Sequence, residues 1–521
     1  MNFKSFIAVI FFVLIIITCN DLNDNKILGT VSIPLANPPE GDYNDSQMIT
    51  LTTTTIDATI YYTLDGSTPT VNSNIYLDPI LVNLGNTLKA YAIKAKWNDS
   101  EILTAKYTQK GTVNSPVAIP ESGIFIAGQT ITLSTTTQGA LIYYTIDGSE
   151  PNINSIKYFE PINLTSNVII KAIAIKDGLN DSSILSETYN INNIYIVGYF
   201  NDGMDGYNNS LRKEACYWIN GQRHFLSVPI GSSDAEARGI AASDGNIYIV
   251  GDVYLSNIGR RALYWVNGQQ NEILINVNDP NPVTNSIAVE NGNIYITGYY
   301  ITSSPTTGSS PTAFIWINGQ IMVLPSPSVA SRTTSIVVSD NTPYISGYYG
   351  HDYHDERACY WVNDQRIDLP FSGTRSVATS IAVYGNTVYI SGWYNDGNSN
   401  TIACYWVNGE KIDLLVPGTT TSNIDANANS IYIEDNSVYI AAYYYYQTRR
   451  TSCYWVDGQV IDLTNVTLPT IRNIAVFNEQ IYIIGQSLWG NAFYWVNDRS
   501  YPLESDSNTY SDAYDIIIVG E

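Results

Sequence analysis

The sequence CYWVNGEKIDLL, Cys404 to Leu415, decides the fold of this chain, because close copies of it recur six more times between residues 215 and 503. The other copies begin CYWINGQ, LYWVNGQ, FIWINGQ, CYWVNDQ, CYWVDGQ and FYWVNDR. Their tryptophans are Trp218, Trp265, Trp316, Trp361, Trp406, Trp455 and Trp495, spaced 40 to 51 residues apart. This spacing is the length of one four-stranded propeller blade. The repeat therefore predicts a seven-bladed β-propeller over residues 192–521.

Four strand-like pieces make up each repeat: an alternating SIAV-type run, an xYIxG run, the YWVNG run and a short IDL-type run. The array opens on an xYIxG run, Ile194–Tyr199, and ends on an unaccompanied run of the first type, Asp515–Val519. We therefore predict that the last run joins the opening pieces of the array. Such pairing closes the ring and removes exposed sheet edges.

Loop length distinguishes the two faces of this propeller. Tight Asn-Gly-type turns join the first piece to the second and the third to the fourth, whereas the other connections are longer and vary between repeats. Because strand direction alternates, the long connections lie together on one face. We predict that a ligand binds on that face, since variable loops on a rigid scaffold carry function.

A shorter repeat, with a period near 80 residues, occurs twice before the propeller. The first copy contains ATIYYTLDGSTPT, Ala58–Thr70, and the second contains ALIYYTIDGSEPN, Ala140–Asn152. Alternating residues around an Asp-Gly pair predict hairpins. These segments resemble the chitobiase/β-hexosaminidase C-terminal domain, an Fn3-like β-sandwich appendage of glycoside hydrolases. The resemblance implies two non-catalytic sandwiches that act as a stalk, in which Asp65 and Asp147 form turns.

The N-terminus, MNFKSFIAVIFFVLIIITC, has one cation at Lys4 and an apolar run from Phe6 to Ile17. A run this short predicts an export signal and not a spanning helix. Its end, IITC, resembles the lipobox of bacterial lipoproteins, with Thr18 where that family has Gly, Ala or Ser. The resemblance implies that Cys19 is lipidated and that the exported protein is anchored to a membrane of the bacterial envelope, facing the surface or the periplasm. A secretory signal with an incidental cysteine is the alternative.

These features predict an all-β chain with five parts. The predicted parts are a signal peptide at 1–18, a tether at 19–28, β-sandwiches at 29–111 and 112–191, and the seven-bladed propeller at 192–521.

The formal net charge of −23, from 48 acidic and 25 basic residues, opposes binding to a phosphate backbone. We therefore expect no nucleic-acid partner. The partners that we expect are the membrane, through the lipid anchor, and a glycan or protein ligand.

Four cysteines remain after Cys19, and all occupy the same position of the repeat. On the third strand of neighbouring blades, equivalent residues should lie at least ~9 Å apart. This exceeds the ~7 Å Cα separation that a disulfide allows. We predict four free, buried thiols: Cys216, Cys359, Cys404 and Cys453.

Aromatic residues fall into two groups. The repeated Tyr-Trp pairs are predicted to be core, because packing between blades explains their regularity without a ligand. The xYIxG runs lead into the long connections through further aromatic residues, followed by Asn and Asp. Flat rings beside amide and acidic groups suit sugar or peptide recognition. The candidate ligand-binding residues are Phe200, Tyr300, Tyr349, Trp393, Tyr394, Tyr444, Tyr445 and Trp489.

Metal binding has one weak candidate, the stretch HDYHDE that contains His351 and His354. Two histidines and three carboxylates are enough ligands for zinc, but a solvated loop explains them as well. We therefore assign no metal. No phosphate loop, dinucleotide fingerprint or nucleophile elbow occurs in a suitable setting, so we predict no cofactor.

Arginines raise the question of catalysis, because some propellers are glycosidases with an arginine cluster and a tyrosine nucleophile. Arg238 and Arg472 directly precede first-type runs, and Arg332 and Arg375 fall nearby in long connections. The S-x-D-x-G-x-x-W boxes of sialidases are absent, and no carboxylate pair stands out. We assign no catalytic residue and predict a non-catalytic binding or scaffolding protein of the cell envelope. The alternative is a glycoside hydrolase with the propeller as catalytic domain.

Overall fold

The computed structural model describes residues 26–204, 211–256, 258–275, 280–302, 310–327, 330–351, 354–398, 400–416, 424–446, 449–463, 470–487, 490–496, 499–504 and 510–520. Every helix or strand assigned within these ranges is a strand, so the prediction of an all-β chain is confirmed. Cys19 and Trp489 lie outside the described residues. In the part of the chain that is described, no helix has the length and hydropathy needed to cross a bilayer.

Two compact units make up the chain. The first comprises Met1–Glu121, Ile131–Pro161 and Ile169–Glu187, and the second comprises Ser122–Thr130, Ile162–Val168 and Thr188–Glu521.

The first sandwich consists of two sheets. One has the order β1 (Leu35–Asn37), β3 (Gln47–Thr52), β6 (Ile80–Val82), and the other β2 (Gly41–Tyr43), β8 (Leu103–Gln109), β7 (Thr87–Ile93), β4 (Thr59–Thr63), β5 (Asn74–Ile75). Alternation along β7 places Leu88 and Ala90 in the core with Ile49 and Val82.

The second sandwich repeats this plan. One sheet has the order β14 (Ile162–Asn163), β11 (Thr130–Ser134), β9 (Val117–Ile119), and the other begins β13 (Ile156–Lys157), β12 (Leu141–Thr145), β15 (Val168–Ile175). Next to β15 is β16 (Leu185–Met204), which also pairs with β10 (Gly123–Ile126). The predicted domain boundary at 191/192 falls inside this strand, so no loop marks it.

Both Asp-Gly turns have the same hydrogen bonds. The Oδ1 atom of Asp65 accepts from the backbone N of Ser67 at 2.9 Å and from its Oγ at 2.6 Å. Asp147 accepts from Ser149 at 3.0 and 2.6 Å. These bonds lower the pKa of Asp65. The prediction that Asp65 and Asp147 form turns is confirmed.

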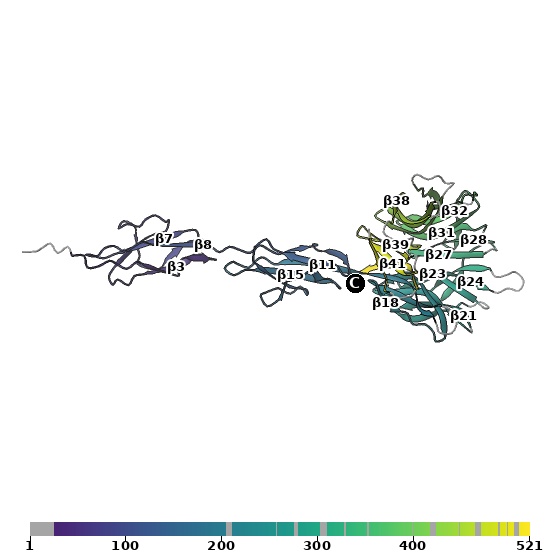
Figure 1. Ribbon diagram of the computed structural model, residues 1–521, viewed down its shortest axis with the longest axis horizontal. Coiled ribbons are helices and arrows are strands. Elements are labelled where there is room, and N and C mark those ends of the chain that lie inside the picture. The colour runs from purple at the N-terminus through teal and green to yellow at the C-terminus, as the bar shows by residue number, and fades with distance from the viewer. Residues whose placement is uncertain are drawn as a thin grey trace, which may run out of the picture. The chain divides into compact units, whose positions relative to one another are not determined.

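Four-stranded antiparallel sheets build the second unit (Figure 1). Three of them are β19 (Ser232–Ser243), β20 (Asn246–Leu255), β21 (Gly259–Val266), β22 (Gln269–Ile273); β23 (Pro280–Glu290), β24 (Asn293–Thr302), β25 (Pro311–Ile317), β26 (Gln320–Val323); and β27 (Ala330–Ser339), β28 (Thr342–Gly350), β29 (Arg357–Val362), β30 (Gln365–Asp368). Three more are β31 (Arg375–Tyr384), β32 (Thr387–Asn395), β33 (Thr401–Val407), β34 (Glu410–Asp413); β35 (Ile424–Glu434), β36 (Ser437–Tyr446), β37 (Arg449–Val456), β38 (Gln459–Asp462); and β39 (Thr470–Phe477), β40 (Gln480–Gln486), β41 (Ala492–Val496), β42 (Arg499–Pro502).

The remaining sheet combines the two ends of the array. The C-terminal strand β43 (Tyr510–Gly520) pairs antiparallel with β16, followed by β17 (Leu211–Ile219) and β18 (Gln222–Phe225). The register runs from Asn192 opposite Gly520 to Asn201 opposite Tyr510. The predicted pairing of the last run with the opening of the array is therefore confirmed.

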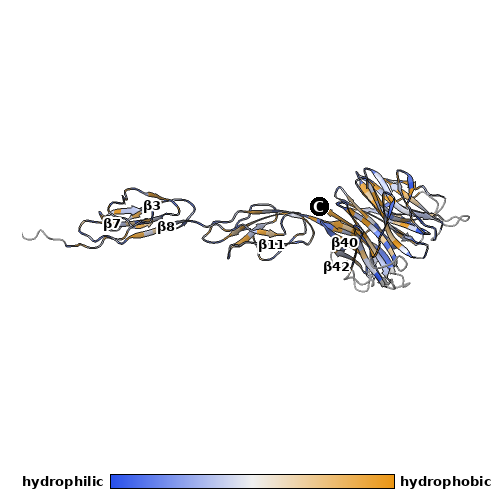
Figure 2. Ribbon diagram, turned by 90° about the horizontal axis from the view of Figure 1, so that it is seen from above, coloured by the Kyte–Doolittle hydropathy of each residue, from blue (hydrophilic) through white to orange (hydrophobic). Residues whose placement is uncertain are grey.

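The first strands of these sheets surround a common centre. Each contacts the first strand of the next sheet, in the order β19, β23, β27, β31, β35, β39 and β43, and β43 contacts β19. The described residues thus form a closed circuit, which is the arrangement of a β-propeller. Figure 2 shows hydrophobic and hydrophilic segments mixed along the strands of these sheets.

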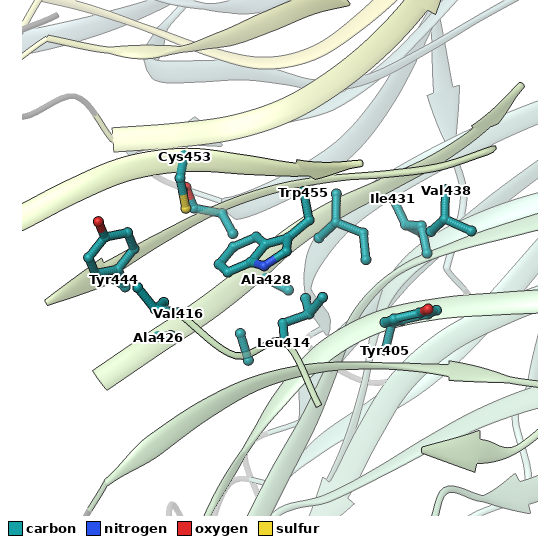
Figure 3. Close-up of a cluster of buried hydrophobic side chains, with 13 residues drawn as sticks. Tyr405, Leu414, Val416, Ala426, Ala428, Ile431, Val438, Tyr444, Cys453 and Trp455 are labelled. Atoms are coloured by element: carbon teal, nitrogen blue, oxygen red, sulfur yellow. The ribbon is translucent and has the colours of Figure 1, made fainter. Parts of the chain in front are cut away.

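The repeated tryptophans pack between neighbouring sheets. In Figure 3, Trp455 of β37 lies beside Leu414, which follows β34 of the preceding sheet, in a cluster that also contains Tyr405 and Cys453. All seven tryptophans are at most 5% exposed. The prediction that they are core is confirmed.

Several tryptophans also form a hydrogen bond to the preceding sheet. The indole Nε1 of Trp265 donates to the carbonyl oxygen of Ser227 at 2.7 Å, and that of Trp406 donates to Pro370 at 2.8 Å. Each of these bonds holds the connection after a fourth strand against the next sheet.

The four cysteines are free and buried, as predicted. Burial raises the pKa of the Cys404 thiol well above its ordinary value, so the thiol stays protonated.

We predict that Trp406→Phe destabilises the protein more than Trp455→Phe does. Both changes remove a similar ring area, but only Trp406 leaves a carbonyl oxygen without its donor, because the Nε1 of Trp455 has no hydrogen-bond partner among the described residues. The expected difference in unfolding free energy is about 1–2 kcal/mol. Denaturant titration of both variants measures it, and equal losses would contradict the role of the indole bond.

A second prediction concerns Asp515, whose carboxylate joins three first strands where the ring closes. It accepts from Ile240 N of β19 at 3.0 Å, from Ile516 N at 2.9 Å, and from Asn473 Nδ2 of β39 at 2.5 Å. Burial raises the pKa of Asp515 to about 7, above its ordinary value of about 3.9. The folded state therefore holds the proton more tightly than the unfolded state, and this stabilisation is lost as pH rises from about 4 through about 7.

The measurement is the melting temperature of the wild type and of Asp515→Asn between pH 4 and pH 8. We expect the wild type to lose more stability across this range than the variant, which cannot ionise at that position. Asp435→Asn, in the exposed turn after β35, should follow the wild-type profile. Parallel profiles for Asp515→Asn and the wild type would contradict the prediction.

Candidate functional site

Each first strand contains a β-bulge at the same place. The register of every first strand shifts by one residue against its partner, so that one residue stands outside the ladder. The bulged residues are Arg238, Asn285, Thr334, Thr379, Asn429, Arg472 and Tyr514. A bulge turns its side chain out of the alternating pattern. All seven line one hollow at the centre of the ring.

Bulged side chains bind the next strand of the ring. The Oγ1 of Thr334 donates to the carbonyl oxygen of Ala378 at 2.9 Å, and that of Thr379 donates to Ala428 at 2.8 Å. The Nδ2 of Asn429 donates to Ile471 at 2.7 Å. These bonds continue from sheet to sheet, so the bulged residues both line the hollow and hold neighbouring strands together.

The bulge also explains the glycine of the xYIxG run. At Gly347 a Cβ would overlap the carbonyl oxygen of Arg332 and come within 2.8 Å of the Trp361 ring. The same overlap occurs at Gly392 with Val377. At these two positions glycine permits a close approach of two backbones, and its φ is not in the left-handed region. The equivalent residue of β36 is Ala442, so the requirement for glycine does not hold in every repeat.

The central hollow has a volume of about 890 Å³, within the range of roughly 300–1,000 Å³ typical of ligand sites. Besides the bulged residues, its lining consists of Tyr299, Arg332, Thr333, Tyr348, Tyr443, Arg450, Thr470 and Ile471. These residues lie near the starts of first and third strands and the ends of second strands. This is the end of the sheets from which the long connections extend.

Four arginines line the central hollow, and the structure corrects the position of one. Arg332 lies within strand β27 and not in a connection, because the first strands begin several residues before the SIAV-type runs. Arg375, also expected in a connection, starts β31; it pairs with Glu356 at 2.5 Å and stacks on Trp393 at 4.8 Å. Arg375 does not line the hollow.

Carboxylates neutralise the arginines on one side of the hollow. Arg238 pairs with Glu236 and, at 3.0 Å, with Asp252, and Arg472 pairs with Asp512 at 2.7 Å. Burial alone raises the pKa of Glu236, but the charge of Arg238, aided by Lys213, outweighs it and lowers that pKa below its ordinary value. None of these carboxylates is among the lining residues.

Four of the predicted ligand-binding aromatics are core residues. Phe200, Tyr300, Tyr394 and Tyr444 are 1–8% exposed. Each shares a strand face with the isoleucine four residues earlier, as Tyr300 does with Ile296, and both pack against the tryptophan of the same repeat. Period-two alternation therefore carries these side chains into the core and turns the preceding residue toward the hollow. Tyr299 and Tyr443, the residues before Tyr300 and Tyr444, accordingly line the hollow, as does Tyr348, the residue before Tyr349.

Hydroxyl groups of the second aromatics bind the fourth strands. The Oη atoms of Tyr349, Tyr394 and Tyr444 donate to Asp368, Asp413 and Asp462 at 3.1, 3.2 and 3.1 Å. Arg366 stacks on Tyr349 at 4.0 Å. These residues fasten the outer strand of each sheet and do not line the hollow.

The other predicted ligand-binding aromatics are Trp393, Tyr445 and Trp489. Trp393 is half-buried beneath Arg375. Tyr445 is 37% exposed, and its ring lies 5.9 Å from that of Tyr443, which lines the hollow. Trp489 lies outside the described residues.

The histidine loop shows two exposed side chains, His351 and His354. Among the described residues, no group of three or more His, Cys, Asp or Glu side chains could hold a metal ion. Asp352, between the histidines, lies outside the described residues.

Comparisons with known proteins identify the sandwiches. Residues 38–104 and 120–186 each match the chitobiase/beta-hexosaminidase C-terminal domain. No curated protein sequence matches the chain.

Solved structures similar to the chain include propellers. The β-propeller domain of the Trilobed protease from Pyrococcus furiosus is 13% identical, with a TM-score of 0.38, over 66% of this chain and 96% of that one. Trypanosoma rangeli sialidase in complex with sialic acid is 9% identical, with a TM-score of 0.32, over 61% and 56%. A quinonprotein alcohol dehydrogenase-like protein from Bacteroides thetaiotaomicron is 11% identical, with a TM-score of 0.30, over 77% and 98%. At these values the likenesses concern the fold alone.

We predict that Thr379→Val destabilises the ring, because it leaves the Ala428 carbonyl without its donor. The expected loss of unfolding free energy is about 1–3 kcal/mol. Thr284→Val is the matched control, since the buried Oγ1 of Thr284 has no partner among the described residues, and it should be neutral or stabilising. Denaturant titration compares the two, and a loss at Thr284 as large as that at Thr379 would contradict the prediction.

Proposed function

We propose that this protein is an exported, lipid-anchored component of a bacterial cell envelope that binds a glycan without altering it. The sandwiches act as a stalk, and the seven-bladed propeller binds the ligand in its central hollow. The observation that carries this proposal is the ring of bulged side chains. It places arginine, asparagine, threonine and tyrosine groups around one space that is large enough for a ligand.

The lining favours a glycan over a peptide. Hydroxyl, amide, phenol and guanidinium groups predominate, and Ile471 is its aliphatic side chain. A peptide bound in extended form uses backbone hydrogen bonds and apolar side-chain pockets. Here the carbonyls of Ala378, Ala428 and Ile471 already accept from bulged side chains.

The lining opposes the alternative of a hydrolase. Glycosidases commonly use two carboxyl groups beside the scissile bond, whereas the described residues that line the hollow include no Asp or Glu. A tyrosine nucleophile would benefit from a lowered pKa. Burial instead raises the pKa of Tyr514, as it raises that of Tyr348 to about 12.

The test is a glycan array with the full-length protein and three variants. Tyr299→Ala and Tyr443→Ala remove rings that line the hollow. Tyr384→Ala removes an exposed ring at the other end of its sheet, at the tight turn between β31 and β32. We expect binding to weaken at least tenfold in the first two variants and to persist in the third, with all three folded by circular dichroism.

The same proteins are assayed on a panel of chromogenic glycosides. If the wild type cleaves a glycoside and Tyr299→Ala and Tyr443→Ala do not, the protein is a glycoside hydrolase and the binding proposal is wrong. Glycan binding that survives both changes would place the ligand outside the hollow.

A further inference from the structure

The four arginines among the described lining residues differ in their ion pairs. Arg238 and Arg472 are held by carboxylates, as described above. Among the described residues, no carboxylate lies within ion-pair distance of Arg332 or Arg450. These two arginines therefore have no ion pair in the described part of the chain. The charge of Arg332 still acts on Glu356, whose pKa is raised by burial and partly lowered by Arg375 and Arg332.

Tyrosine rings position these two arginines. The Arg332 guanidinium lies 5.3 Å from the ring centre of Tyr299 and 5.8 Å from that of Tyr348. The Arg450 guanidinium lies 3.9 Å above the ring of Tyr443. Stacking fixes the plane of a guanidinium and leaves its edge for hydrogen bonds. Arg332 uses part of that edge for a bond to the Tyr348 hydroxyl.

Arg450 has an unused donor. Its Nη1 donates to the Oγ1 of Thr470 at 3.2 Å, but its Nε is buried and has no hydrogen-bond partner among the described residues. The guanidinium group of Arg450 therefore has hydrogen-bonding capacity that the described residues do not use. A carboxylate is the acceptor that matches guanidinium geometry.

Acceptors complete the chemistry of the hollow. The Nδ2 groups of Asn285 and Asn429 donate to backbone carbonyls of the next strand, which leaves their Oδ1 oxygens as acceptors. These acceptor oxygens can accept hydrogen bonds from the hydroxyl groups of a sugar. They find no donor on a phosphate or sulfate, whose oxygens only accept. A ligand with hydroxyl groups and a carboxylate can donate to the asparagine oxygens and accept from the arginines.

We propose that the central hollow binds an acidic sugar residue, whose carboxylate is held by Arg450 with Arg332 as the second positive charge. This inference rests on the proposed function and specifies its ligand class. It also predicts that binding weakens as salt is raised, because the attraction is partly between charges.

The experiment is calorimetric titration with oligosaccharides of galacturonic, glucuronic and mannuronic acid, each compared with its methyl ester. Esterification removes the charge and keeps the hydroxyl groups. We expect at least one acid to bind at least tenfold more tightly than its ester. We expect Arg450→Gln to abolish that preference, whereas Arg366→Gln, at the outer edge of its sheet, keeps it.

The outcomes separate the two proposals. Equal binding of acid and ester, lost in Tyr443→Ala, would overturn the acidic-sugar inference and leave the glycan-binding function standing. An acid preference that survives Arg450→Gln would overturn the role of this arginine. Binding of a glutamate-rich peptide in place of every sugar would overturn the sugar class, and no binding of any probe or array glycan would overturn both proposals.

Discussion

One extra residue in each first strand determines the interior of the ring. The bulge presses the backbone of the first strand against that of the second, and a carbonyl oxygen occupies the space that a Cβ would need at Gly347 or Gly392. The glycine of the xYIxG run accommodates this approach at Gly347 and Gly392, whereas Ala442 stands at the equivalent place in β36. The bulge itself turns a side chain toward the hollow in every described sheet of the ring.

This arrangement separates the scaffold from the site. Tryptophan, leucine and isoleucine pack between sheets, on the strand faces that alternation assigns to the core. The bulged residue stands outside that alternation, so it can be polar without leaving a polar group in the core. Its bonds to the next strand, such as that from Thr379 to Ala428, add stability around the hollow itself.

Period and spacing were sufficient to predict the strands, the pairing of β43 with β16 and the free cysteines, because each depends on the regular part of the repeat. The candidate site was predicted less well. Tyr300 and Tyr444 are aromatic and precede long connections, yet alternation from Ile296 and Ile440 could have placed them in the core. The polar or aromatic residue directly before each SIAV-type run was the signal for the lining.

The ion pairs around the hollow could not be predicted from the sequence, because they depend on the register between neighbouring strands. Glu236 and Asp252 lie opposite each other in the ladder between β19 and β20, an arrangement that would repel without Arg238 between them. No sequence pattern pairs these residues, since sixteen positions separate the two carboxylates and a bulge intervenes. That the described residues form no ion pair with Arg332 or Arg450 depends on the same details of register.

The seven bulged positions are separate from one another in sequence and already hold four residue types: Arg, Asn and Thr twice each, and Tyr once. Arg450 also lines the hollow, from a third strand. Substituting one of the bulged residues alters a single sector of the hollow and leaves the hydrophobic packing between sheets in place. A ring built in this way can acquire a new ligand through a few point changes, without any insertion or rearrangement of loops. The fold thus offers a natural starting point for engineering receptors by exchanging one side chain per blade.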